Sequence, residues 1–200
     1  MNASQAIILA AGFSNRMGSD KAGLAWLGGE ALLTWMNQSL QDAGWNTVIV
    51  LGPHNFAYWE CRLKSTILVC NPEPELGKTR SIAQGVMAIC ATKVPIMITA
   101  VDQPRPQELY RRLRIQSIGE DEILVPDRAG RNGHPVVFSP MYWTPLLNLE
   151  EARGGLRGLL EDHRDKIRRL PCDPDWLSWD CNTPGAYERA RSWFELNQSD

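Results

Sequence analysis

The amino-acid sequence predicts a three-layer α/β/α domain built on a mostly parallel sheet. Short, continuously apolar runs, such as residues 6–10 and 47–51, are typical of strands that are buried on both faces. Segments with helical periodicity lie between these runs, and this alternation is typical of a parallel sheet covered by helices on both sides. A length of 200 residues suits one hydrophobic core. We therefore predict a single domain over residues 1–200, with the strand at 6–10 in the centre of its sheet.

Turn-forming residues mark the limits of the other expected elements. Gly44 ends a helix over 31–43. The segments 122–126 and 135–138 flank a polar, turn-rich stretch, which indicates a hairpin-like excursion around 122–165. Further strands are expected at 66–70, 95–101 and 176–180, and further helices at 79–91, 106–116, 156–163 and 184–196.

Charge and composition exclude several classes of protein. The formal net charge of -2 provides no large basic field for nucleic acid. None of the five cysteines forms a C-x-x-C pair, so we expect reduced thiols in a reducing compartment rather than a zinc site. No apolar run approaches the roughly 20 residues of a membrane span, and no Lys or Arg precedes the apolar run at 6–11, as it would in a signal peptide. We expect a cytoplasmic protein that binds neither nucleic acid nor membranes.

The strongest local signal is the loop that follows the first strand. Small residues allow backbone N–H groups to approach phosphate oxygens closely, and nearby cations neutralise the charge of such a ligand. A surface loop with two solvated cations explains the same composition equally well. The spacing of Gly12 and Gly18 fits neither a Walker A loop nor G-x-G-x-x-G. The candidate nucleotide-binding residues of this loop are Leu9, Ala10, Ala11, Gly12, Arg16 and Lys21.

Five segments together resemble one enzyme family. The sequence Leu-Ala-Ala-Gly-x-Ser-x-Arg-Met-Gly from Leu9, followed by Lys21, resembles the signature of the small nucleotidyltransferases that include molybdenum cofactor cytidylyltransferase. Four more segments resemble this family in the same order: a second nucleotide-side segment at 77–85, a metal-binding turn at 102–104, a Gly-His-Pro segment at 130–138 and a late Asp-x-x-Thr-Pro motif at 180–184. The resemblance implies a Rossmann-like, glycosyltransferase-A-like fold. It also implies transfer of a nucleoside monophosphate from a triphosphate to an acceptor, with release of pyrophosphate.

The resemblance also implies roles for individual residues. Arg16, Lys21 and Asp102 would be catalytic. Asp102 and Asp180, each at the end of an apolar run, would share Mg²⁺, a cation that prefers oxygen ligands. The commoner use of Asp before Pro or Thr-Pro is a turn or a helix cap, and the resemblance favours the metal over that use. The remaining implied contacts are those of Gly77, Arg80 and Ser81 with the nucleotide, and those of Gly133, His134 and Pro135 with the acceptor.

The substrates are less closely defined than the reaction. Ala11 fits the cytidylyltransferase branch, because relatives that transfer GMP typically have a second Gly there, so we expect CTP. A phosphorylated acceptor such as molybdopterin is implied, and a molybdoenzyme remains open as a protein partner. Departures from the family pattern at 79–82 and before Gly28 leave the acceptor undefined. A guanylyltransferase, a sugar-phosphate nucleotidyltransferase and a non-catalytic accessory protein that carries a cofactor are the alternatives.

Overall fold

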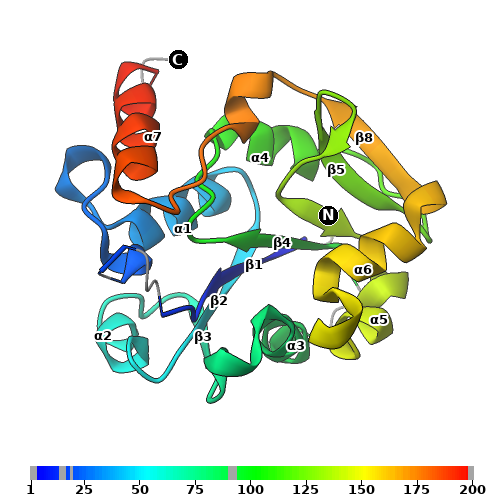
Figure 1. Ribbon diagram of the computed structural model, residues 1–200, viewed down its shortest axis with the longest axis horizontal. Helices are drawn as coiled ribbons and strands as arrows, with labels where there is room; N and C mark the ends of the chain where they lie inside the picture. Colours follow the sequence, from blue (N-terminus) through cyan, green and yellow to red (C-terminus); the bar gives the residue numbers. More distant parts are fainter. Residues whose placement is uncertain (1–3, 14–16, 19, 90–93, 198–200) are drawn as a thin grey trace.

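The computed structural model describes residues 4–13, 17–18, 20–89 and 94–197 (Figure 1). In this part of the chain, eight strands form one sheet. The strands are β1 (Gln5–Ala10), β2 (Asn46–Leu51), β3 (Ile67–Cys70), β4 (Ile96–Ala100), β5 (Ile123–Arg128), β6 (Arg131–Asn132), β7 (Val136–Phe138) and β8 (Ile167–Pro171). The α-helices are α1 (Leu32–Asp42), α2 (Phe56–Glu60), α3 (Lys78–Ile89), α4 (Gln107–Arg114), α5 (Trp143–Leu147), α6 (Gly155–Asp162) and α7 (Pro184–Leu196).

The sheet is mostly parallel, as predicted. Its strand order is β3-β2-β1-β4-β7-β5-β6, and β8 pairs with β5 in parallel. β1 is central, with β2 and β4 parallel to it on either side. Among the strands of this sheet in the described residues, the antiparallel pairs belong to the excursion after α4. They lie between β7 and its neighbours β4 and β5 and within the β5–β6 hairpin. The hairpin-like excursion predicted from the turn-rich stretch is therefore present.

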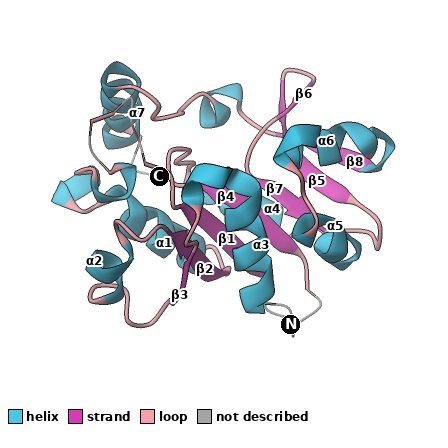
Figure 2. Cartoon of the chain, turned by 60° about the horizontal axis from the view of Figure 1, so that its bottom comes forward, coloured by secondary structure: helices cyan, strands magenta, loops and turns pink. Residues whose placement is uncertain are grey.

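Helices cover both faces of the sheet, which confirms the three layers (Figure 2). Side chains alternate along β1. Ile8 belongs to the core cluster that includes residues of α1, α4 and α7 on one face, and Ile7 belongs to the cluster that includes residues of α3, α5 and α6 on the other. Gly85 brings α3 close to β1, because a Cβ atom at this position would lie 2.6 Å from Cγ2 of Ile7. None of the helices in the described segments is long and apolar enough to cross a membrane.

The strand predicted at 176–180 was wrong. Residues Pro174–Leu177 form a 3-10 turn, because Pro174 cannot donate a ladder hydrogen bond and the side chain of Asp173 caps the turn by accepting from the N–H of Asp175. The last strand is instead β8, whose sequence Ile-Arg-Arg-Leu-Pro lacks the apolar run of a buried strand.

Candidate active site

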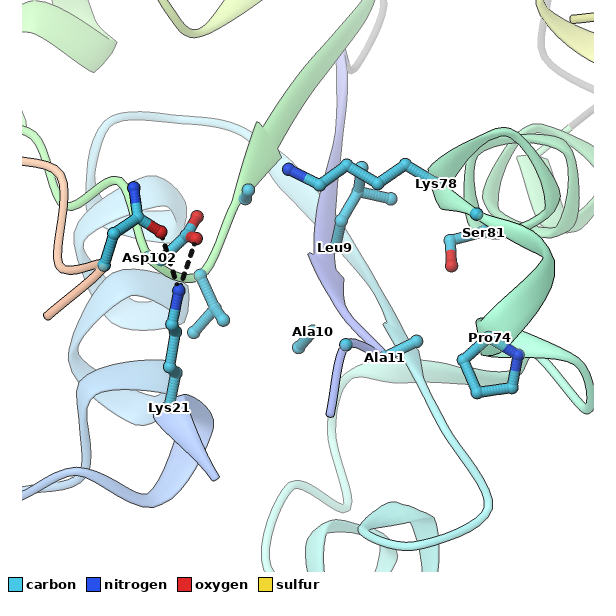
Figure 3. Close-up of a pocket in the computed structure, with 13 residues that line it drawn as sticks. Leu9, Ala10, Ala11, Lys21, Pro74, Lys78, Ser81 and Asp102 are labelled. Carbon is cyan, nitrogen blue, oxygen red and sulfur yellow. Dashed lines mark hydrogen bonds and ion pairs between the residues drawn. The ribbon is translucent and has the colours of Figure 1, made fainter. Parts of the chain in front are cut away.

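A cavity of about 370 Å³ opens at the carboxyl edge of the sheet, where β1 and β4 end side by side. From β1 the chain leads to β2 on one side, and from β4 it leads to β5 on the other. The two connections diverge here, which makes this the position where open α/β sheets bind ligands. Four segments far apart in sequence line the cavity. They are the end of β1 and its loop, the segment that leads into α3, the end of β4 (Figure 3), and the late motif at Asn182. The predicted residues found in its lining are Leu9, Ala10, Ala11, Gly12, Lys21, Gly77, Ser81 and Asp102.

Two features of this lining suit a phosphate chain. A Cβ atom at Gly12 would meet no heavy atom within 4 Å, so the backbone of the loop borders open space. Gly77 has φ of 106°, in the left-handed region, and turns the chain into α3, whose first residues face the cavity. The N-terminus of a helix favours anions, and Lys78 adds a positive charge that extends over Leu9 (Figure 3).

Lys21 connects the end of β4 with the late motif on another wall of the cavity. Its Nζ donates to Oδ2 of Asp102 and to Oδ1 of Asn182, each at 2.8 Å (Figure 3 shows the bond to Asp102). The side chains of Lys21 and Asp102 are only 13% and 16% exposed, so the pair is partly shielded from solvent. The cavity therefore has a cation and a carboxylate within one hydrogen-bond distance of each other.

Asn55 fixes the two ends of the loop that carries Lys21. Its Nδ2 donates to the carbonyl of Ala10 and to Oδ2 of Asp20, both at 3.0 Å. Oδ1 of Asp20 accepts from the N–H of Ala22 and caps the short 3-10 turn that begins at Lys21. Buried Asn55 thus connects the end of β1 with the residue before Lys21, a role that the sequence did not reveal.

The oxygens around Lys21 form a donor set that suits a divalent cation. An ammonium group already lies between the Asp102 carboxylate and the Asn182 amide oxygen, so both oxygens face one cationic position. Hard cations such as Mg²⁺ bind carboxylate and amide oxygens and keep further sites for water and substrate phosphates. Asp180, predicted to share the metal with Asp102, is not in the cavity lining, and its Oδ1 accepts from Arg105 at 2.8 Å. The residue of the late motif that reaches Lys21 is Asn182.

Arg105, only 2% exposed, connects three segments of the predicted site. Its guanidinium donates to the carbonyls of Pro104, His134 and Trp179 as well as to Asp180. The turn after β4, the Gly-His-Pro segment and the late motif are therefore tied to one buried cation.

A second cavity, of about 270 Å³, adjoins the first. The two share Leu9, Lys78 and Ala100 in their linings, and His134, predicted to contact the acceptor, lines the second but not the first. Burial, followed by the charge of Arg105, lowers the pKa of His134, so its imidazole is neutral at pH 7. Gly133 must be glycine, because a Cβ atom there would lie 2.9 Å from both the carbonyl oxygen of Pro126 and a methyl group of Leu177.

Not every predicted residue lies in a cavity wall. Arg80 is exposed and outside both linings, and Arg16 lies outside the described residues. Lys78 and Asn182 line the first cavity although the sequence analysis did not select them. The sequence did contain a signal for both residues, since Lys78 directly follows Gly77 and Asn182 lies inside the late motif.

Fold and cavity together define a class of α/β enzymes that bind nucleotides at the carboxyl edge of a parallel sheet. The chain belongs to the family of MobA-like NTP transferase domains, whose sequence profile matches residues 6–167. It is therefore a nucleotidyltransferase, of a family that binds a nucleoside triphosphate and a phosphorylated acceptor and uses a divalent metal. No curated protein matches the chain significantly.

Several solved structures are similar over nearly the whole chain. Rv0371c from Mycobacterium tuberculosis is 26% identical, with a TM-score of 0.78 over 96% of this chain and 100% of that chain. Its complex with manganese gives 24% identity and a TM-score of 0.74 over 95% and 98% of the two chains. A nucleotidyl transferase from Methanothermobacter thermautotroptrophicus is 22% identical, with a TM-score of 0.82 over 98% and 99%. Molybdopterin-guanine dinucleotide biosynthesis protein A from Archaeoglobus fulgidus is 17% identical, with a TM-score of 0.65 over 96% and 99%.

Proposed function

We propose that this protein transfers CMP from CTP to a phosphorylated acceptor such as molybdopterin, with Mg²⁺, and releases pyrophosphate. The observation that carries the proposal is the single cavity that collects the β1 loop, the N-terminus of α3 and the Lys21–Asp102–Asn182 cluster. Its wall offers N–H donors, cations and a carboxylate, which are the groups that nucleotidyl transfer requires.

The reaction displaces pyrophosphate from the α-phosphorus of the triphosphate. An oxygen of the acceptor phosphate attacks, the bond to the bridging oxygen breaks, and negative charge grows on the leaving pyrophosphate. The N–H groups after β1, those at the start of α3 and the Lys21 ammonium stabilise that charge. Bound Mg²⁺ would supply further charge neutralisation beside Asp102 and Asn182, with Asp180 as a further candidate ligand. The structure of Rv0371c in complex with manganese supports the use of a divalent cation.

The choice of CTP rests on Ala11, which is 3% exposed in the wall of the nucleotide cavity. A methyl group here leaves less room than the Gly of the guanylyltransferase branch, so the larger purine should fit worse. The acceptor would enter from the side of His134, through the second cavity. Four free cysteines in the described segments, Cys61, Cys70, Cys172 and Cys181, support our expectation of a reducing, cytoplasmic location.

Release of pyrophosphate measured with each of the four triphosphates, with and without a molybdopterin-type acceptor, tests the proposal. We expect release with CTP that requires both the acceptor and Mg²⁺. Release with another acceptor would retain the enzyme class and replace the acceptor. Tight binding of molybdopterin without any turnover, whichever triphosphate is present, would contradict the proposal and favour an accessory protein that carries the cofactor.

A further inference from the structure

A third cavity, of about 710 Å³, lies beyond His134 on the acceptor side. The β5–β6 hairpin, α6 and β8 enclose it, and Figure 2 shows these elements at one end of the sheet. Four arginines line it: Arg131, Arg157, Arg164 and Arg169. We call this cavity the arginine groove.

Positive charge in the groove is only partly neutralised. Glu161 pairs with Arg157 at 2.8 Å, but both side chains are more than half exposed, and such pairs contribute little. Arg131, Arg164 and Arg169 form no ion pair with any carboxylate in the described segments. Several guanidinium groups around one hollow repel one another and attract an anion.

The two arginines of β8 differ in their partners. Arg168 and Arg169 are neighbours on the strand, so their side chains point to opposite faces. Arg168 donates to both carboxylate oxygens of Glu122, at 2.6 and 3.2 Å. Arg169 lines the groove without such a partner in the described residues. Unlike Arg168, Arg169 therefore has no structural partner to account for its charge.

The groove continues the path of the acceptor. His134, Leu156 and Arg157 line both the groove and the second cavity, which in turn shares part of its wall with the nucleotide cavity. Three hollows thus follow one another from the triphosphate to the arginines. Asn132 also lines the groove, and its buried side-chain oxygen has no hydrogen-bond partner in the described part of the chain. That oxygen can accept from a hydroxyl or N–H group of a bound molecule.

We propose that the arginine groove binds a second oxyanion of the acceptor, at the end remote from the attacking phosphate. This inference rests on the proposed function and names a substrate class: acceptors that carry two separated anionic groups. Guanidinium groups bind phosphate and carboxylate oxygens through paired N–H donors, which suits either kind of oxyanion. Continuity with the second cavity favours a small acceptor over an acidic protein.

Binding can be tested without knowing the acceptor. The nucleotide cavity is first saturated with Mg²⁺ and the α,β-methylene analogue of CTP, and inorganic phosphate is then titrated while the arginine Nε–Hε signals are followed by NMR. We expect the signals of Arg131, Arg164 and Arg169 to shift along one common binding curve. In Arg164→Gln/Arg169→Gln the affinity for phosphate should fall about tenfold or more. The control Lys64→Gln/Arg189→Gln removes two exposed charges elsewhere and should bind phosphate like the wild type.

Two outcomes would overturn the inference. One is phosphate affinity that is equal in the groove variant and the control variant. The other is a response of the arginine signals to a poly-glutamate peptide but not to phosphate, which would identify a protein-docking surface. The affinity of each variant for the CTP analogue should remain unchanged, and this readout separates failure of the groove from failure of the nucleotide site.

Turnover provides the second test. Release of pyrophosphate from CTP is compared for pairs of acceptors that differ only in a second phosphate. Wild-type protein should show a KM at least about tenfold lower for the bisphosphate, and the groove variant should lose that preference at a similar KM for CTP. Turnover with no preference in the wild type would overturn this inference and leave the proposed transferase intact, whereas no release with any acceptor would count against the proposed function itself.

Discussion

The ammonium group of Lys21 lies in the lining of the first cavity, beside the Asp102 carboxylate. If it stabilises charge on the leaving pyrophosphate, Lys21→Ala should lower kcat/KM by on the order of 10²-fold or more, as loss of one preorganised group typically does. Lys21→Arg keeps the charge and should lose less. The measurement is steady-state pyrophosphate release, with the exposed Lys64→Ala as the control. Unchanged kinetics in Lys21→Ala would remove Lys21 from the mechanism.

Asp102 and Asp180 make different contacts. Replacing each of them with Asn therefore distinguishes binding of Mg²⁺ from a structural role. Asp102→Asn keeps the shape of a side chain that lines the cavity but removes the carboxylate proposed to bind Mg²⁺. The Mg²⁺ concentration for half-maximal rate should therefore rise about tenfold or more. Asp180→Asn should raise it too if the carboxylate shares the cation. Full activity of Asp180→Asn at limiting Mg²⁺ would show that Asp180 serves only as the partner of Arg105.

We expect His134 to make the stability of the folded protein depend on pH. Because burial lowers the pKa of His134 from its ordinary 6.5, protonation favours the unfolded chain. The stability that neutral His134 contributes to the folded state is fully present above the pKa of the unfolded chain. It is lost as pH falls below about 6.5, toward the lowered pKa of His134 in the folded state. Thermal unfolding from about pH 8 to about pH 5 should show a steeper loss of Tm in the wild type than in His134→Gln. Parallel curves for the two proteins would exclude this coupling.

Arg105 acts at the level of whole elements, because it joins the loop after β4 to the Gly-His-Pro segment and the late motif. Arg105→Met keeps much of the volume but leaves buried carbonyl groups without donors, at about 1–3 kcal/mol for each group that water cannot reach. We expect the free energy of unfolding to fall by about 2–4 kcal/mol in urea titrations. The KM for the acceptor should also rise, and at temperatures where the variant stays folded the KM for CTP should change less. A lower stability with both KM values unchanged would limit Arg105 to folding.

Sequence patterns predicted those elements that obey a simple rule. Continuous apolar runs identified β1, β2, β3 and β4, since strands buried on both faces show little else. β8 was not predicted. Its two arginines lie on opposite faces of the strand, where Arg168 binds Glu122 and Arg169 lines the groove, and this tertiary arrangement leaves no pattern in the local sequence. The late motif was found through the family resemblance, which implied a metal at Asp180. Asn182, the residue of this motif that bonds to Lys21, was not selected. The buried role of Arg105 was not predicted, because a charged residue in a turn after a strand is normally expected to be exposed to solvent.

Ligand binding should stabilise the whole molecule, and the size of that effect reports the choice of nucleotide. A ligand that binds only the folded state stabilises it by about 2.7 kcal/mol at a concentration of 100 times its Kd. For a chain of 200 residues this corresponds to a rise in Tm of roughly 5–10 °C. With Mg²⁺ and equal concentrations of triphosphate, we expect a larger rise in Tm with CTP than with GTP. The methyl group of buried Ala11 in the cavity wall leaves less room for the larger purine base. Ala11→Gly should reduce the difference between the two nucleotides, while Ala186→Gly on α7 controls for the general cost of a new glycine. A larger rise with GTP in the wild type would reverse the assignment of the nucleotide and leave the reaction class unchanged.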